Sequence, residues 1–174
     1  MSPRELHLLL TGRPGVGKTT VLRTVAERLE GERIAGFLTE EIREGGRRVG
    51  FRGIPLGVGE AVTISHVDFS GPTVGKYGVD VGAVDRLVEA NLENGEPDLY
   101  LVDEIGKMEC LSERFVDRMD DLLDGSTPVV ATVGRGNRGL MGEAKERDGV
   151  EIIEVTRENR DELPGTIADR VRER

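Results

Sequence analysis

The feature that most constrains the fold of this chain is a glycine-rich loop at residues 12–19, GRPGVGKT, which matches the pattern G-x-x-x-x-G-K-[ST]. Residues 6–11 before it form an uninterrupted apolar run, which is typical of a strand buried on both faces. Residues 20–29 after it carry apolar side chains at the spacing of an amphipathic helix. The sequence therefore predicts a strand, a glycine loop and a helix in direct succession, as at the start of many α/β folds.

Each fixed position of this loop suits the binding of phosphate groups. The glycines allow backbone N–H groups to surround phosphate oxygens, and the helix N-terminus adds the positive end of its dipole. We expect the ammonium of Lys18 to reach the β- and γ-phosphates of a nucleotide and the hydroxyl of Thr19 to bind Mg²⁺. A glycine turn with an exposed lysine is the alternative, and the flanking strand and helix argue against it.

A second predicted strand, residues 99–102, ends at the acidic pair Asp103 and Glu104. A phosphate-binding loop needs a carboxylate at the end of another strand for its Mg²⁺, and Asp103 fits that position. Glu104 can polarise a water molecule for attack on the γ-phosphorus, whereas kinases usually offer that place to a substrate hydroxyl. Two solvated acids at a strand end are the plain alternative, which the nearby loop motif disfavours.

The rest of the chain alternates between strands and helices. Strands are predicted at residues 34–40, 47–54, 61–65, 129–133 and 151–155, and helices at 80–91, 112–123, 140–147 and 157–172, the last broken near Pro164. This rhythm predicts an α/β three-layer sandwich: a mostly parallel central sheet, helices on both faces and an antiparallel hairpin extension. We expect a single domain, residues 1–174, with a glycine-rich hairpin subregion at about residues 34–82.

The composition argues against several classes of partner. A formal net charge of −9 and an aromatic content of 3% disfavour an extended nucleic acid, which needs a basic surface and rings for stacking, and also an anionic membrane. No apolar run approaches the length of a membrane span or a signal-peptide core. The single cysteine, Cys110, rules out an intramolecular disulfide and suits a reducing compartment, so we expect a cytoplasmic protein.

Further segments extend the pattern beyond the loop. Residues 103–109 read DEIGKME, residues 36–43 read GFLTEEIR, residues 74–79 read VGKYGV and residues 155–160 read VTRENR. Together with the loop and in this order, they resemble the THEP-type family of small P-loop nucleoside-triphosphatases, also called cancer-related nucleoside-triphosphatases, over nearly the whole chain. The loop is shared by very many proteins, and the DEIGKME run is much more specific.

The resemblance implies a P-loop NTPase fold and a slow hydrolase that uses Mg²⁺ and accepts ATP, GTP, CTP and UTP. The nucleotide site that it implies comprises Gly12, Arg13, Pro14, Gly15, Val16, Gly17, Lys18, Thr19, Thr20, Asp103, Glu104, Ile105 and Gly106. Within this set Lys18 and Glu104 are the expected catalytic residues, and Thr19 and Asp103 are the expected Mg²⁺ ligands. The sequence names no protein partner.

A cationic side chain that stabilises the transition state is also expected, and the sequence offers Lys107, Arg135, Arg138 and Arg160. Arg135 and Arg138 follow the predicted strand at residues 129–133, at the edge where open α/β sheets bind ligands. Asn159 and Arg160 follow another strand and are candidates for contacting the base, with N-capping or packing as the alternative for Asn159. The glycine-rich loop that carries Arg135 and Arg138 is poorer in proline than the family pattern.

Three further residues have plainer interpretations. Arg43 and Tyr77 either line a lid or pack within the glycine-rich subregion. Lys145 reads as an ordinary surface residue, whereas the other three of the four lysines fall in segments of the family pattern.

Two other functions compete with hydrolysis. A small P-loop kinase, which transfers the γ-phosphoryl group to a nucleoside, a nucleotide or another hydroxyl acceptor, would have the same size and fold. An NTP-dependent switch would instead bind a protein partner through its glycine-rich hairpins. An acceptor that gains phosphate distinguishes the kinase, and turnover stimulated by a partner distinguishes the switch.

Overall fold

The structure is a computed structural model that describes residues 7–173, so Leu6, the predicted start of the first strand, lies outside the described residues. Its strands are β1 (His7–Thr11), β2 (Ile34–Glu44), β3 (Arg47–Pro55), β4 (Val62–His66), β5 (Thr73–Val74), β6 (Tyr77–Val79), β7 (Leu99–Ile105), β8 (Val129–Val133) and β9 (Val150–Glu154). Its helices are α1 (Lys18–Arg28), α2 (Val81–Asn91), α3 (Glu113–Asp124), α4 (Leu140–Glu146) and α5 (Leu163–Arg172), with a short 3₁₀ helix η1 (Glu109–Leu111).

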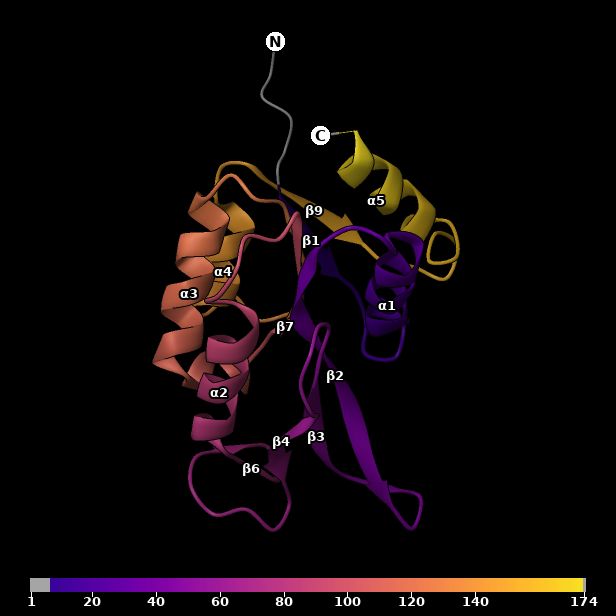
Figure 1. The fold of residues 1–174 in the computed structure, drawn as a ribbon. Coiled ribbons are helices and arrows are strands. Elements are labelled where there is room, and N and C mark those ends of the chain that lie inside the picture. Colours follow the sequence, from indigo (N-terminus) through magenta and orange to yellow (C-terminus); the bar gives the residue numbers. More distant parts are fainter. Residues whose placement is uncertain (1–6, 174) are drawn as a thin grey trace.

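These strands form one sheet in the order β5-β6-β4-β3-β2-β7-β8-β1-β9 (Figure 1). The five strands from β2 to β9 in this order pair in parallel. The remaining strands, β3 to β6, extend the sheet beyond β2 by antiparallel pairing. The predicted α/β architecture, a parallel core with an antiparallel hairpin extension, is therefore confirmed.

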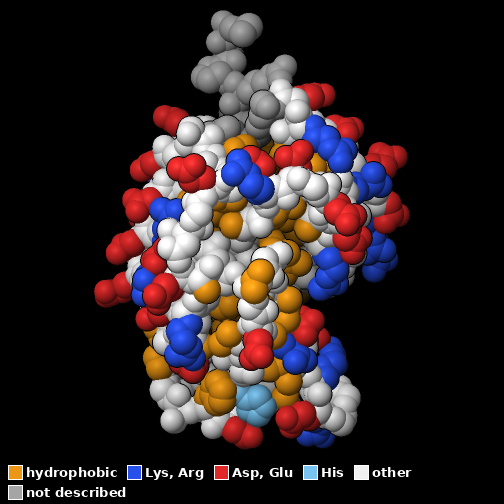
Figure 2. Space-filling model, viewed as in Figure 1, with side chains coloured by type: hydrophobic (Ala, Val, Ile, Leu, Met, Phe, Trp, Pro, Cys, Tyr) orange, Lys and Arg blue, Asp and Glu red, His pale blue; other side chains and the backbone are white. Residues whose placement is uncertain are grey.

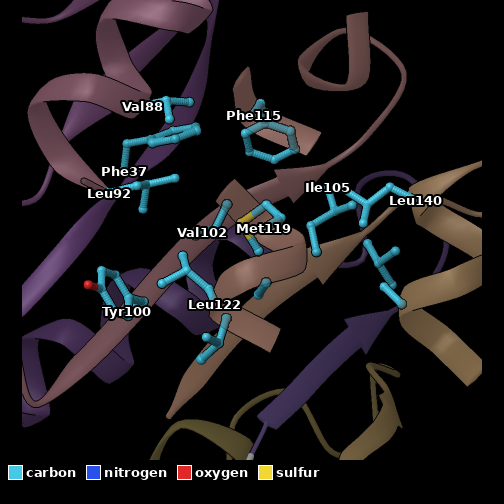
Figure 3. Packing of buried hydrophobic residues seen from close by; sticks show 14 of the residues in the cluster. Phe37, Val88, Leu92, Tyr100, Val102, Ile105, Phe115, Met119, Leu122 and Leu140 are labelled. Atoms are coloured by element: carbon cyan, nitrogen blue, oxygen red, sulfur yellow. The ribbon is translucent and has the colours of Figure 1, made fainter. Parts of the chain in front are cut away.

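Helices cover both faces of the parallel strands. Figure 1 shows α1 and α5 together on one side and α2, α3 and α4 on the other. The first pair packs on a cluster of aliphatic side chains that includes Leu8, Leu101 and Ile167. The second group packs on a larger cluster, in which Phe37 of β2 lies beside Val88 of α2 and Leu92, the residue after this helix (Figure 3). A continuous apolar sequence at each central strand is needed because both faces are buried in this way.

Local sequence signals account for two of the helix starts. The side chain of Ser112 accepts a hydrogen bond from the Phe115 N–H at 3.0 Å, which is the predicted N-cap of α3. Asp80 caps α2 in the same manner through the Ala83 N–H. These caps fix where each helix begins and thus which of its faces meets the sheet.

Three predictions about the elements were wrong or incomplete. Strand β2 continues to Glu44 instead of ending at residue 40, because its second half pairs with β3 as far as the Gly45-Gly46 turn. Strands β5 and β6 were not predicted. Helix α5 begins at Leu163, so Pro164 lies in its first turn and does not break it, since the first-turn N–H groups have no helical partner to lose.

The surface of the face in Figure 1 is charged along both sides, and apolar side chains gather along its middle (Figure 2). Among the helices of residues 7–173, none combines the length and the apolar character that crossing a membrane requires.

Candidate functional site

The glycine-rich loop joins β1 to α1, as predicted, and its lysine folds back over it. Gly12 has a φ of 154°, and a Cβ atom there would lie 2.9 Å from the carbonyl oxygen of Val155, so this position excludes other residues. The Lys18 ammonium donates a hydrogen bond to the carbonyl of Gly12 at 3.0 Å. The lysine charge and the N-terminus of α1 therefore face the same enclosed space.

Asp103 is the most connected carboxylate of the site. It is 3% exposed and lies within β7, which continues to Ile105 instead of ending at residue 102. Its Oδ2 accepts from the Thr19 hydroxyl at 2.8 Å and from the N–H and hydroxyl of Thr39, both at 3.3 Å. Its Oδ1 accepts from the Thr132 hydroxyl at 2.7 Å. Four hydrogen bonds hold this carboxylate beside the first turn of α1.

Thr39 and Thr132 were not named by the sequence analysis. They lie on β2 and β8, the two strands that flank β7 in the sheet. The signal available for Thr132 was a hydroxyl inside the otherwise apolar run VVATV. The sequence alone does not show that this hydroxyl reaches Asp103. Whether it does depends on the strand order, because among the strands only those next to β7 can bring a side chain to Asp103.

Glu104 follows Asp103 through a cis peptide bond and is only half-buried. Burial raises the pKa of its carboxyl group, the negative charge of Asp103 raises it further, and the charge of Lys18 opposes both effects. Its carboxylate rests against Gly106, where a Cβ atom would lie 2.5 Å from Oε1. A carboxylate with a raised pKa is a stronger base when ionised, which suits it to accept a proton.

A cavity of about 470 Å³ joins these residues. It is lined by Pro14, Lys18, Thr19, Thr39, Phe51, Ile64, Val74, Asp103, Glu104, Lys107, Met108, Glu109, Gly134, Arg135, Gly136 and Met141. The predicted catalytic and metal-binding residues thus meet in one space, although they are some 85 residues apart in the chain. Lys107 and Arg135 are the two cationic candidates that border it.

The other predicted residues lie outside this cavity. The Arg160 guanidinium donates to the carbonyl of Val16 at 3.1 Å and so supports the loop. Asn159 accepts from the Thr156 N–H and donates to the carbonyl of Glu154, so its amide holds the turn before α5. It does not cap the helix, because the N-cap residue of α5 is Glu162, so of the two alternatives the structure favours packing. Arg138 is exposed.

Ile105 and Gly106 continue the acidic strand into the core. The Ile105 side chain is fully buried, and its carbonyl accepts from the Gly134 N–H at 2.9 Å. Gly106 is buried and its carbonyl accepts from the Cys110 N–H at 3.0 Å. Only the backbone of Ile105 faces the neighbouring loop, so any contact of this residue with a ligand would come from main-chain atoms.

The interpretation of Lys145 as an ordinary surface residue was wrong. Its ammonium donates to the carbonyl of Gly136 at 2.9 Å and to the side chain of Asn137 at 3.3 Å. Burial lowers its pKa, and the charge of Lys18 lowers it further. Lys145 therefore holds the cavity loop at Gly136, a role that sequence spacing does not reveal.

Arg43 and Tyr77 pack within the glycine-rich subregion. The Arg43 guanidinium bonds Glu41 and the carbonyl of Gly46 at the hairpin tip. Tyr77 is buried and accepts a hydrogen bond from Arg48 at 2.8 Å. Of the two interpretations, packing is the one that the structure shows.

The loop between a buried strand and a helix, with its threonine bonded to an acid of another parallel strand, is the arrangement of a P-loop nucleotide-binding protein. Comparison with known proteins narrows this class. The model of a family described as NTPase matches residues 7–168. A nucleoside-triphosphatase THEP1 of Natranaerobius thermophilus is 39% identical, with 97% of this chain and 98% of the relative covered. One from Methanopyrus kandleri is 40% identical, with 96% of each chain covered.

Solved structures agree. The crystal structure of THEP1 from the hyperthermophile Aquifex aeolicus matches with a TM-score of 0.84 at 35% identity, covering 95% of this chain and 98% of that one. The solution structure of a human cancer-related nucleoside triphosphatase matches with a TM-score of 0.82 at 34% identity, covering 98% of both chains. The chain belongs to the THEP1 family of nucleoside-triphosphatases.

Proposed function

We propose that this protein hydrolyses nucleoside triphosphates to the diphosphate and phosphate by direct attack of water on the γ-phosphorus. The observation that carries the proposal is the convergence of Lys18, Thr19, Asp103 and Glu104 on one cavity. Membership of the THEP1 family supports the same reaction class. The geometry adds a division of roles among the four residues.

The oxygens beside the loop suit a magnesium ion. Mg²⁺ prefers hard oxygen ligands, and the Thr19 hydroxyl and the Asp103 carboxylate supply them 2.8 Å apart. Thr39 and Thr132 orient the Asp103 carboxylate toward Thr19. When bound there with the nucleotide, Mg²⁺ would neutralise part of the charge of the β- and γ-phosphates.

The residues around the cavity each have a part in the hydrolytic step. The loop amides and the Lys18 ammonium hold the phosphates and stabilise the charge that develops on their oxygens. Glu104 orients the water and takes its proton as the new O–P bond forms. The bond from the γ-phosphorus to the bridging oxygen breaks, and its electron pair leaves with the nucleoside diphosphate.

A broad base range and slow turnover belong to the same proposal. The residues that meet in the cavity address phosphate groups, which are identical in ATP, GTP, CTP and UTP. Arg135 and Lys107 are exposed, and within residues 7–173 no hydrogen bond holds either side chain in place. A mobile cation stabilises a transition state less than a fixed one, so we expect slow hydrolysis.

Release of inorganic phosphate from the four triphosphates, with Mg²⁺ and with EDTA, tests the proposal. We expect Lys18→Ala to abolish turnover and to weaken nucleotide binding, and Glu104→Gln to slow hydrolysis by about 10²–10⁴-fold while binding is retained. Lys76→Ala and Glu60→Gln are matched controls, since both residues lie in the glycine-rich subregion and neither lines the cavity. Hydrolysis at the normal rate in the Glu104 variant would remove Glu104 from the mechanism.

A further inference from the structure

The cavity beside Glu104 is much larger than hydrolysis requires. A single water molecule needs about 10–15 Å³, whereas sites for small organic molecules begin at about 300 Å³. The cavity of about 470 Å³ falls in the second range, even though its phosphate end must also receive the γ-phosphate. It is therefore large enough for a group bigger than the attacking water beside the γ-phosphate.

The two ends of the cavity differ in chemistry. Lys18, Thr19, Asp103 and Glu104 form the phosphate end. We call the apolar part of the lining the far end: it comprises Phe51, Ile64 and Val74 of the hairpin extension, Met108 before η1 and Met141 of α4. Contact with an apolar wall does not stabilise bound phosphates or metal ions. It does stabilise the hydrocarbon part of a small organic ligand, because that part is removed from water.

One polar side chain in this wall, that of Glu109, is only partly hydrogen-bonded. Glu109 lines the cavity, is 4% exposed, and its Oε2 has no hydrogen-bond partner among the described residues. Burial raises the pKa of its carboxyl group well above the ordinary value, and the charge of Glu104 raises it further. Burial therefore favours the neutral form of the Glu109 carboxyl group, and in that form it can donate one hydrogen bond and accept another. An unsatisfied buried group of this kind costs free energy unless a ligand completes it.

We propose that the far end of the cavity binds a small neutral alcohol with an apolar frame and a second hydrogen-bonding group, and that the protein transfers the γ-phosphoryl group to its reactive hydroxyl. The second group of the alcohol meets Glu109, and the reactive hydroxyl lies at Glu104. This inference rests on the proposed function, because it uses the same triphosphate site and the same base.

The step balances without a further reactant. The alcohol oxygen attacks the γ-phosphorus and forms a new O–P bond, while its proton passes to Glu104. The bond to the bridging oxygen breaks, and the nucleoside diphosphate leaves with the electron pair. The products are the phosphate monoester of the alcohol and the nucleoside diphosphate. Hydrolysis is the same reaction with water in place of the alcohol.

The test uses the full-length protein with γ-labelled ATP, Mg²⁺ and 1,4-benzenedimethanol, a neutral aromatic diol. We expect a labelled phosphate monoester, resolved from inorganic phosphate by chromatography. 4-Methylbenzyl alcohol, which lacks the second hydroxyl, should have a KM about fivefold higher, the effect of one neutral hydrogen bond. Benzyl methyl ether, which lacks a reactive hydroxyl, should give no ester.

Two variants separate the far end from the phosphate end. Val74→Trp fills the apolar wall and should abolish ester formation while phosphate release without alcohol continues. Val67→Trp is the matched control, since Val67 lies in the same subregion, is 37% exposed and does not line the cavity. If Val74→Trp does not fold, Glu109→Leu provides the second readout: it should give the diol and 4-methylbenzyl alcohol equal KM values, whereas Glu109→Gln keeps their difference.

Each outcome is decisive. A labelled ester that disappears in Val74→Trp supports the proposal, and so does selective loss of the diol preference in Glu109→Leu. Phosphate release without any ester from either alcohol overturns the transfer and leaves the proposed hydrolysis standing. Ester formation that survives Val74→Trp places the alcohol elsewhere and also overturns the proposal. If the unaltered protein forms neither inorganic phosphate nor the ester, the proposed function itself is refuted.

Discussion

Replacing Gly106 with alanine tests whether the position of the Glu104 carboxylate matters. The new Cβ would lie 2.5 Å from Oε1 of Glu104, and an ordinary contact needs about 3.4 Å, so the carboxylate must move by about 0.9 Å. The new Cβ would also lie 2.9 Å from Cγ and 3.0 Å from Cδ of Glu104, so most of this side chain must shift with its carboxylate, whereas the backbone tolerates alanine because Gly106 does not adopt a positive φ. A misplacement of about 1 Å costs about 10²-fold in rate, or about 2.7 kcal/mol of transition-state stabilisation.

The assay is kcat for phosphate release from ATP, with nucleotide affinity measured separately. We expect Gly106→Ala to lower kcat by about 10²-fold while the dissociation constant for ATP changes little. Gly57→Ala is the control, since a Cβ at Gly57 meets no atom within 4 Å and that glycine also lacks a positive φ. The double variant Gly106→Ala with Glu104→Gln should be no slower than Glu104→Gln alone. A normal rate in Gly106→Ala, or full additivity in the double variant, would refute the reasoning.

Three further predictions concern the residues around the cavity. Thr132→Val leaves Oδ1 of the buried Asp103 without its hydrogen bond and should lower the free energy of unfolding by about 1–3 kcal/mol in urea titrations; no loss would mean that water replaces the hydroxyl. Because the folded-state pKa of Glu109 is raised, the folded protein keeps this proton above pH 4.5 while the unfolded chain loses it. Stability should therefore fall by up to about 1.4 kcal/mol per pH unit between 4.5 and the raised pKa, and Glu109→Gln, compared at each pH, should lack this slope. Lys145→Met releases the carbonyl of Gly136 and should speed hydrogen exchange in residues 134–139 with little effect on α1; unchanged exchange would contradict the anchoring role.

Much of the fold could be predicted because its signals are local. The apolar run of β1, the glycine loop and the amphipathic pattern of α1 are contiguous, and each depends on a few neighbouring residues. The Ser112 cap was predicted for the same reason, since a cap residue bonds an N–H three positions along the chain. Strands β5 and β6 were missed because two- and three-residue strands have no period to recognise, and they form only by pairing with strands already in place.

The proline of α5 illustrates a different limit. A proline inside a helical pattern indicates a break, but the same residue in a first turn is compatible with the helix. Sequence periodicity could not decide between these positions, because residues 157–162 carry polar and charged side chains that suit a helix or a turn. The hydrogen bonds of Asn159 to residues 154 and 156 hold the turn and so set the start of α5 at Leu163.

The sequence by itself determined the phosphate loop, the acidic pair at the end of β7 and the THEP1 resemblance, because each is encoded in consecutive residues. Only the tertiary structure decided what surrounds them. Asp103 meets Thr39 and Thr132 because β2 and β8 flank β7, and this strand order is set by packing across the whole chain. The cavity with Glu109 in its wall forms where the hairpin extension and the parallel core come together. Enclosed space and burial are properties of distant segments in contact, so no local pattern in the sequence records them.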